Sequence, residues 1–322
     1  MKKLPVVASL VAALIGVGVT GSVSATSVSE PSLSAAQAAG PVHPLNILLT
    51  NDDGWRGPGG SSTPLIVALR DALRAAGHHV VVVAPGTDQS GQGGRFSLPP
   101  NQLTVANPES DVWTVTPGSP SDSVYFAFDK AFAHGKPDLV VSGINPGNNM
   151  GSAISHSGTV NAATTALELG VPAIAVSLGT VATWPGGTQA ATPDTTRYVV
   201  GLIARLEATA RKGRLMPDGV ALNVNVPVRP GPIDPATGMP GSALPAKGRE
   251  LTTLSTGQAL ALDYQPVPGQ AGTYSVSLSQ PDTSAPQGTD TRAVEDGFIS
   301  VTPLEADRDV DGATKGWARS VL

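Results

Sequence analysis

Apolar residues near the start of the folded region form short runs that alternate with a helical spacing. Residues 45–50 are a short apolar run, residues 63–76 carry three leucines at every fourth position, and residues 80–84 are rich in β-branched side chains. Short apolar runs are typical of buried strands, whereas a four-residue spacing places side chains on one face of a helix. Because Gly77 marks the end of the helix, the pattern predicts a strand, a helix and a second strand.

The same alternation recurs further along the chain. Strands are predicted at residues 138–142, 173–178 and 220–226, and helices are predicted at residues 159–169 and 195–212. Strands that alternate with helices are typical of a mostly parallel sheet covered by helices on both faces. The sequence therefore predicts a doubly wound α/β fold.

The chain after residue 227 has a different composition. Proline and glycine are frequent at first, and the later apolar stretches are short and widely spaced. We expect β-hairpins that project from the main sheet, with strands at residues 250–255, 260–264 and 274–278. Residues 297–302 are then predicted to return as a strand.

The first residues have the pattern of a secretory signal peptide. Two lysines precede an apolar run of about 16 residues, and small residues follow at Val23, Ser24 and Ala25. We expect cleavage after residue 25 and a secreted or periplasmic protein without membrane attachment. An uncleaved anchor is the alternative, although the run is shorter than the roughly 20 residues that span a bilayer.

The predicted organisation follows from these patterns. A signal peptide of residues 1–25 precedes a linker of residues 26–44, which is rich in Ser, Ala, Gly and Pro. The α/β core spans residues 45–227. Residues 228–322 hold the hairpin arm, the returning strand and a tail.

Composition narrows the classes of partner. The 322 residues include 40% apolar side chains, so the chain is long and apolar enough for a large core. With 25 acidic and 20 basic residues and no basic stretch, we expect neither a nucleic-acid polymer nor a lipid surface as partner. The chain has no cysteine, so core packing must stabilise it, together with any metal or subunit contacts.

Polar residues follow three of the predicted strands. The first strand ends in Asn51-Asp52-Asp53-Gly54, the second runs into a loop with Ser90, and the strand at residues 138–142 opens onto Asn145. Ligands of doubly wound sheets bind at the carboxyl ends of the strands. We therefore expect the oxygen atoms of these three loops to converge on one point.

The adjacent carboxylates of Asp52 and Asp53 repel each other unless a cation compensates them. Mg²⁺ and Mn²⁺ accept carboxylates together with neutral oxygens, which predicts a site for one such cation at Asp52, Asp53, Ser90 and Asn145. The alternative for the aspartates is an ordinary surface turn. For Ser90 or Asn145 alone, a local loop role is the simpler interpretation.

The start of the helix predicted at residues 159–169 is a candidate anion site. Free amides and the positive end of the helix dipole attract phosphate there, so Ser157, Gly158 and Thr159 are predicted to bind it. The alternative, which is compatible, is that Ser157 only caps the helix. His156 precedes this segment, and protonation of a leaving group is one role for it beside a solvent-facing one.

Other phosphate and nucleophile motifs are missing from the sequence. There is neither a Gly-x-x-x-x-Gly-Lys-Ser/Thr loop nor a Gly-x-Ser-x-Gly elbow. The glycine cluster at residues 91–94 has Phe96 where a dinucleotide-binding loop needs its third glycine. These absences disfavour P-loop, hydrolase-elbow and nicotinamide or flavin chemistry.

Taken together, the loops resemble the SurE family of survival-protein nucleotidases over roughly residues 45–305. The resemblance rests on Ile47–Gly54 (ILLTNDDG), Val83–Pro85 (VAP), Gly118–Asp122 (GSPSD), Pro137–Asn145 (PDLVVSGIN), Ser157–Val160 (SGTV), Gly170–Ser177 (GVPAIAVS), Leu222–Pro227 (LNVNVP) and Ile299–Leu304 (ISVTPL).

The resemblance implies a Rossmann-like core with a protruding hairpin arm, and dimers or tetramers held partly by that arm. It implies hydrolysis of nucleoside 5'- and 3'-monophosphates with a divalent cation bound by Asp52, Asp53, Ser90 and Asn145. Three segments depart from the family pattern, and these departures put base recognition and the phosphate pose in doubt. They are residues 89–93 (QSGQG), residues 151–153 (GSA) and His156, where the family usually has Tyr.

We therefore expect a secreted metal-dependent phosphomonoesterase. The cation would lower the pKa of a water molecule for direct attack on phosphorus, and Asp52 or Asp53 would accept its proton. The helix-terminal amides, Asn51 and Asn145 would stabilise charge on the transferred group. The alternatives are a broad phosphatase for sugar phosphates or short polyphosphate, and a nucleotide-binding protein without turnover.

Overall fold

A computed structural model describes residues 43–56, 64–256, 261–279 and 285–306. The predicted signal peptide, most of the predicted linker and the tail after residue 306 lie outside the described residues. Within these ranges, no helix has the length and apolar character needed to cross a membrane.

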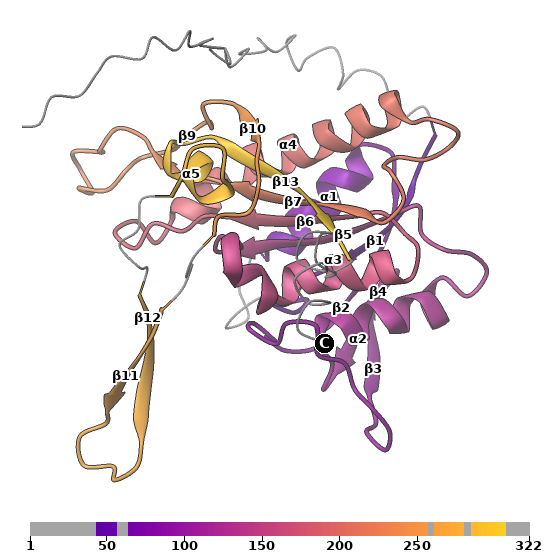
Figure 1. Ribbon diagram of the computed structural model, residues 1–322, viewed down its shortest axis with the longest axis horizontal. Helices are drawn as coiled ribbons and strands as arrows, with labels where there is room; N and C mark the ends of the chain where they lie inside the picture. Colours follow the sequence, from indigo (N-terminus) through magenta and orange to yellow (C-terminus); the bar gives the residue numbers. More distant parts are fainter. Residues whose placement is uncertain (1–42, 57–63, 257–260, 280–284, 307–322) are drawn as a thin grey trace, which may run out of the picture. The chain divides into compact units, whose positions relative to one another are not determined.

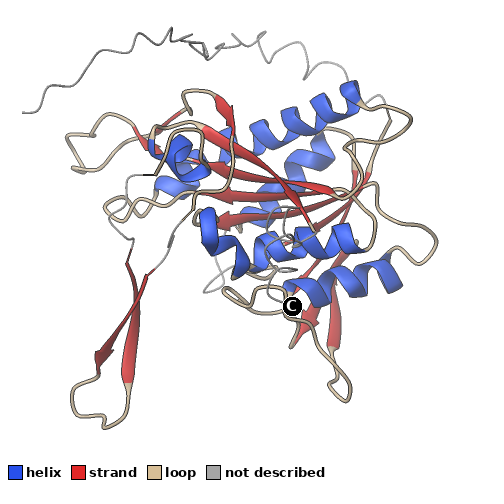
Figure 2. Cartoon of the chain, viewed as in Figure 1, coloured by secondary structure: helices blue, strands red, loops and turns tan. Residues whose placement is uncertain are grey.

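The core is a nine-stranded sheet with helices on both faces (Figures 1 and 2). In spatial order its strands are β10 (Arg249–Leu251), β13 (Ile299–Glu305), β7 (Val220–Val226), β6 (Ala173–Leu178), β5 (Leu139–Pro146), β1 (Asn46–Thr50), β2 (His79–Pro85), β4 (Val112–Thr116) and β3 (Thr104–Glu109). The strands from β7 to β4 run parallel, while β13 pairs antiparallel with β7 and β3 pairs antiparallel with β4. The predicted mostly parallel α/β sheet is confirmed.

Helices and short elements connect the strands. The helices are α1 (Leu65–Ala75), α2 (Pro120–Phe126), α3 (Gly158–Glu168), α4 (Gly187–Thr209), α5 (Asp290–Glu295), the π-helical turn η2 (Ala127–Ala131) and the 3₁₀ helix η3 (Gly151–Ser155). Two further pairs of strands form separate two-stranded sheets, β8 (Arg229–Pro230) with β9 (Ala243–Leu244), and β11 (Ala261–Pro266) with β12 (Tyr274–Ser279).

Strand β1 shows why the sheet is covered on both faces. Its side chains alternate between two hydrophobic clusters, with Ile47 and Leu49 in one and Leu48 in the other. Helices α1 and α4 complete the first cluster, and α2 and α3 complete the second. All three side chains are fully buried, which explains the continuous apolar run of this strand.

Several predicted elements differ from the observed ones. Helix α4 begins at Gly187 and continues through Pro193, although the prediction began at residue 195. Residues 250–255 were expected in a projecting hairpin, but Arg249–Leu251 instead pairs parallel with β13 at the edge of the main sheet. The elements between residues 104 and 126 were not predicted, because β3 is largely exposed and lacks a clear apolar alternation.

The hairpin β11–β12 confirms the predicted antiparallel pair. Six residue pairs join its strands, from Ala261↔Ser279 to Pro266↔Tyr274. Within the described residues, neither strand pairs with the nine-stranded sheet. Apolar side chains on the hairpin are more than half exposed, namely Leu262, Tyr264, Tyr274 and Val276.

Candidate active site

The turn after β1 is buried. Asn51, Asp52 and Asp53 are each at most 5% exposed, whereas an ordinary turn lies on the surface. The Asn51 side chain shapes the turn, because Nδ2 donates to the carbonyl of Gly54 at 3.1 Å and Oδ1 accepts from the Gly54 N–H at 3.2 Å. Gly54 has φ +84° and lies close to the carbonyl of Pro85, a position that favours glycine.

Asp52 contacts the amino end of α3 directly. Thr159 Oγ1 donates to Asp52 Oδ1 at 2.8 Å, and the Thr159 N–H donates to Oδ2 at 3.3 Å. A Cβ atom at Gly158 would lie only 2.8 Å from the Cβ atom of Asp52, so glycine permits this close approach. The fold thus brings a predicted metal ligand and the predicted phosphate-binding segment together across 107 residues of sequence.

Ser157 caps α3, as expected for a polar residue at this position. Its hydroxyl group accepts from the Val160 N–H at 3.1 Å. His156 lies one residue earlier, is exposed, and has a backbone carbonyl that accepts from the Gly93 N–H at 3.0 Å. The loop after β2 is therefore held against the segment that leads into α3.

The loop with Ser90 also lies against Asp52. The Gln89 N–H donates to the Asp52 carbonyl at 2.7 Å. Both the backbone N–H and the hydroxyl group of Ser90 donate to Asp88 Oδ1, at 2.9 Å and 2.7 Å. Asp88 was not among the predicted site residues, although an acidic residue two positions before Ser90 was visible in the sequence.

Three carboxylates determine the electrostatics of the site. Burial, together with the charges of Asp52 and Asp88, raises the pKa of Asp53 from 3.8 to about 8. Burial also raises the pKa of Asp52, against hydrogen bonds from Thr159 that lower it. Among the described residues, no Lys, Arg or His forms an ion pair with these three carboxylates, so no cationic side chain balances their charge.

This charge distribution fits a hard divalent cation, which carboxylate and neutral oxygen donors accommodate. The described part of the chain has no cluster of three or more His, Cys, Asp or Glu side chains arranged to hold a metal ion. The predicted donor set contains only two such side chains, Asp52 and Asp53, and relies on Ser90 and Asn145 for the remainder.

Asn145 lies at the end of β5, beside β1 in the sheet. Strand β5 runs through residues 143–146, which the sequence pattern had placed in a loop, and its register with β6 shifts between Ser142 and Asn145. Asn145 Nδ2 donates to the carbonyl of Gly147 at 2.8 Å, which leaves Oδ1 as its ligand-type oxygen. In the described ranges, neither Asn145 nor Ser90 makes a side-chain hydrogen bond to Asp52 or Asp53.

A buried polar network holds the loop between β5 and α3. The Asn149 N–H donates to Asn225 Oδ1 at 2.7 Å, and Asn149 Nδ2 donates to Ser177 Oγ at 2.9 Å. The Asn149 carbonyl accepts from the side chains of Asn223 and Asn225 at 2.8 Å and 3.0 Å. Sequence reasoning missed these residues, although two asparagines in the otherwise apolar β7 were a signal.

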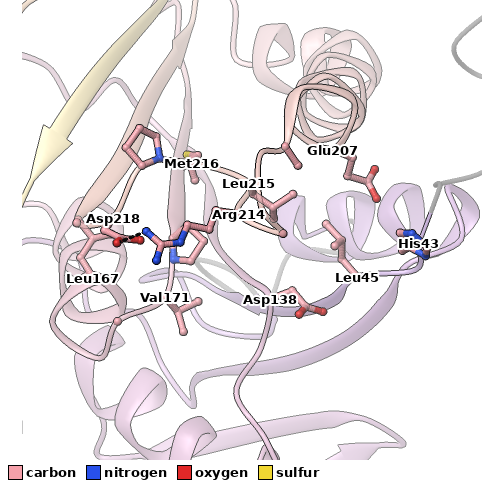
Figure 3. Close-up of a pocket in the computed structure, with 16 residues that line it drawn as sticks. His43, Leu45, Asp138, Leu167, Val171, Glu207, Arg214, Leu215, Met216 and Asp218 are labelled. Atoms are coloured by element: carbon pink, nitrogen blue, oxygen red, sulfur yellow. Dashed lines mark hydrogen bonds and ion pairs between the residues drawn. The ribbon is translucent and has the colours of Figure 1, made fainter.

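A cavity lies at the other end of the parallel strands, and Figure 3 shows the side chains that line it. Its lining includes Leu45, which precedes β1, and Asp138, which precedes β5. The amino ends of the parallel strands therefore surround it, while Asp52 and Asn145 lie at the carboxyl ends. Since ligands of such sheets bind at the carboxyl ends, the carboxylate cluster is the better candidate site.

Comparisons with known proteins identify the family of the chain. The family model described as survival protein SurE matches residues 47–252. The chain belongs to the SurE family. This SurE chain is 35% identical over 263 residues to a protein named 5'-nucleotidase SurE from Geotalea uraniireducens, covering 82% of this chain and 94% of the relative. A protein of the same name from Xanthomonas axonopodis pv. citri is 36% identical over 266 residues, covering 82% and 90%.

A solved structure supports the same fold. The crystal structure of the SurE protein from Aquifex aeolicus matches with a TM-score of 0.66 and 29% sequence identity, covering 86% of this chain and all of that one. The family and the fold class predicted from the sequence are thus confirmed.

Proposed function

We propose that this SurE protein is a divalent-metal-dependent phosphomonoesterase that hydrolyses nucleoside 5'- and 3'-monophosphates. The observation that carries the proposal is the contact of Asp52 with Thr159. This contact places the carboxylates of Asp52 and Asp53, which have no cationic side chain as partner in the described residues, against the amino end of α3. Helix amino ends attract phosphate. Relatives named 5'-nucleotidase SurE support a nucleotide as the source of that phosphate.

Asp52, Asp53, Ser90 and Asn145 would hold one Mg²⁺ or Mn²⁺ ion. When bound, the cation supplies positive charge for the phosphoryl oxygens and makes a water molecule more acidic. Asp52 or Asp53, the two carboxylates beside the cation, would accept the proton of the attacking water. Thr159 keeps the Asp52 carboxylate fixed, and the amino end of α3 orients the phosphate.

The test is phosphate release from AMP by the mature chain. After treatment with a chelator, activity should disappear and return on addition of Mg²⁺ or Mn²⁺, and Asp52→Asn should remove it. Asp138→Asn, which changes an aspartate at the amino end of β5, is the control and should retain activity. Activity that survives both chelation and Asp52→Asn would contradict the mechanism.

The substrate range needs its own measurement. A panel of nucleoside monophosphates, sugar phosphates and short polyphosphate distinguishes a nucleotidase from a broad phosphatase. The broad phosphatase is the alternative because the sequence departs from the family pattern around Gln92 and at exposed Ser152. AMP binding measured by calorimetry without phosphate release would instead identify a nucleotide-binding protein. We expect the highest kcat/KM for a nucleoside monophosphate.

We further propose that the protein is exported and forms a homodimer or homotetramer through its hairpin. Exposed apolar patches of this kind are typical of subunit interfaces, and Tyr264 and Tyr274 lie in a strand pair that is otherwise unpartnered in the described residues. Light scattering should give a multiple of the mass of the mature chain, and the double variant Tyr264→Asp with Tyr274→Asp should reduce the mass to that of one chain.

The proposed export has its own test. N-terminal sequencing of the exported protein tests cleavage after Ala25.

A further inference from the structure

Asp290 is a fully buried carboxylate outside the candidate site. It is the first residue of α5, and it accepts hydrogen bonds from three backbone N–H groups. Oδ2 accepts from Gly151 at 2.8 Å, while Oδ1 accepts from Ser255 at 2.9 Å and from Thr291 at 2.8 Å. Hydrogen bonds to a charged acceptor are stronger than neutral ones, so this side chain fixes three segments of the chain to one another.

The first of these segments leads to the phosphate-binding end of α3. Gly151 begins η3, and Met150, which precedes it, provides no side-chain cap. Asp290 therefore satisfies an N–H group at the start of η3 from 139 residues away. Because η3 ends at Ser155, only two residues before Ser157 begins the capping of α3, a shift of Gly151 would displace the start of α3.

The other two segments flank the hairpin β11–β12 in the sequence, and we call them the roots of the hairpin: residues 253–255 before it and residues 290–291 after it. Ser255 precedes the hairpin in the chain, and Asp290 and Thr291 follow it. The hydroxyl groups of Ser255 and Thr291 lie 2.7 Å apart, and the Asp290 N–H donates to the Thr253 carbonyl at 2.9 Å. Both roots of the hairpin thus meet at the carboxylate that holds Gly151.

We propose that Asp290 is a positioning residue that couples the roots of the hairpin to the phosphate-binding end of α3. The inference rests on the proposed nucleotidase function for its kinetic consequence, but its structural part does not. Asp290 acts through Gly151 and η3, and in the described part of the chain it makes no hydrogen bond with Asp52 or Asp53. Removal of the Asp290 carboxylate should therefore weaken phosphate binding but leave cation binding nearly unchanged.

Asp290→Asn is the decisive variant, because it keeps the shape of the side chain but replaces an acceptor oxygen by a donor NH₂ group. With its oxygen kept towards Ser255 and Thr291, where it satisfies two donors, the amide leaves the Gly151 N–H without an acceptor. The two remaining hydrogen bonds weaken, because a neutral acceptor replaces a carboxylate. We expect inhibition of AMP hydrolysis by inorganic phosphate to weaken about tenfold. The Mn²⁺ concentration for half-maximal activity should stay within about twofold, because the contact of Asn149 with β7 holds the preceding part of the loop independently.

Two controls separate positioning from loss of stability. Ser255→Ala removes the hydroxyl contact with Thr291 but leaves Gly151 its acceptor, so it should retain wild-type inhibition by phosphate. Ile203→Val, a core substitution in α4, lowers the stability without touching Asp290 and should also retain it. Equal weakening of phosphate and Mn²⁺ binding by Asp290→Asn would overturn the proposal, as would no change in either.

Hydrogen exchange of the metal-free protein gives a readout that does not need activity. In the wild-type chain the Gly151 amide should exchange slowly, and rapid exchange there would overturn the proposal even if Asp290→Asn fails to fold. In folded Asp290→Asn, exchange should accelerate at residues 151–157 and at residues 253–256 together, whereas Ser255→Ala should affect only the latter. If the wild-type chain does not hydrolyse AMP, the nucleotidase proposal fails, while the exchange data still test the coupling.

Discussion

The hydroxyl group of Thr159 donates to Asp52 Oδ1 at 2.8 Å, so the amino end of α3 and the turn after β1 share one hydrogen-bonded pair. The same threonine donates its backbone N–H to the other oxygen at 3.3 Å. Asp52 is therefore held at both oxygen atoms by a single residue. This arrangement orients a carboxylate that would otherwise be free to rotate in a buried, negatively charged site.

Thr159→Val should test the importance of that orientation. The substitution preserves the shape of the side chain but removes the hydroxyl donor, so we expect kcat for AMP to fall about ten- to hundredfold. Loss of this donor should also raise the pKa of Asp52, because the Thr159 side chain lowers it. Thr164→Val in the same helix, where the hydroxyl group donates to the Val160 carbonyl, is the matched control and should keep kcat near wild type.

Asp53→Asn should stabilise the metal-free chain while removing its activity. The folded-state pKa of Asp53 is raised to about 8 from an ordinary value of 3.8, so the charged carboxylate disfavours folding increasingly as pH rises between these values. The free energy of unfolding, measured by urea with a chelator present, should exceed that of wild type at pH 8 and approach it near pH 4. Exposed Asp129→Asn should show no such trend.

A divalent cation should reverse this penalty. The metal-free site carries more negative charge at pH 8 than at pH 5, because Asp53 loses its proton over that range. Mn²⁺ or Mg²⁺ should therefore raise Tm more at pH 8 than at pH 5. Scanning calorimetry at both pH values checks this, and a Tm increase that is equal at both, or retained in full by Asp52→Asn, contradicts it.

His78 should make the chain sensitive to acid. Burial, with a contribution from His79, lowers the pKa of His78 below its ordinary value of 6.5, and Nδ1 accepts from the Leu45 N–H at 3.3 Å. A lowered histidine pKa gives stability that is present above pH 6.5 and is lost as pH falls through the folded-state pKa. Between pH 7.5 and 5, His78→Asn should therefore lose less free energy of unfolding than wild type does, whereas exposed His134→Asn should match wild type.

The sequence predicted the parts of the fold that depend on local patterns. The apolar runs of β1, β6 and β7 were located within one residue of their observed bounds, because strands buried on both faces carry continuous apolar side chains. Helix α4 was predicted too short, since Pro193 normally interrupts a helix. Strand β5 was predicted to end at residue 142, since glycine at position 143 is unfavourable inside a strand.

The candidate site was predictable only to the level of its loops. Strand ends identified the loops of Asp52, Ser90 and Asn145, and the joint role of these residues as ligands stays a prediction. The partners of Asn149 and Asp290 were not predictable, because tertiary packing chooses them. The contact of Asp88 with Ser90 is local and could have been predicted from the sequence. Nothing in the sequence around Asp290 indicates that its carboxylate accepts a hydrogen bond from the Gly151 amide, 139 residues away.

The pairing of Asp52 with Thr159 has a consequence for the order of events during folding. The two residues are 107 positions apart, and β5 lies between their elements in the chain and beside β1 in the sheet. No short fragment can assemble this pair, so the carboxylate cluster forms only after the parallel sheet has closed over long loops. Binding of the proposed cation would therefore be a late step, and a cation held at this site would distinguish the folded protein from every partly folded form.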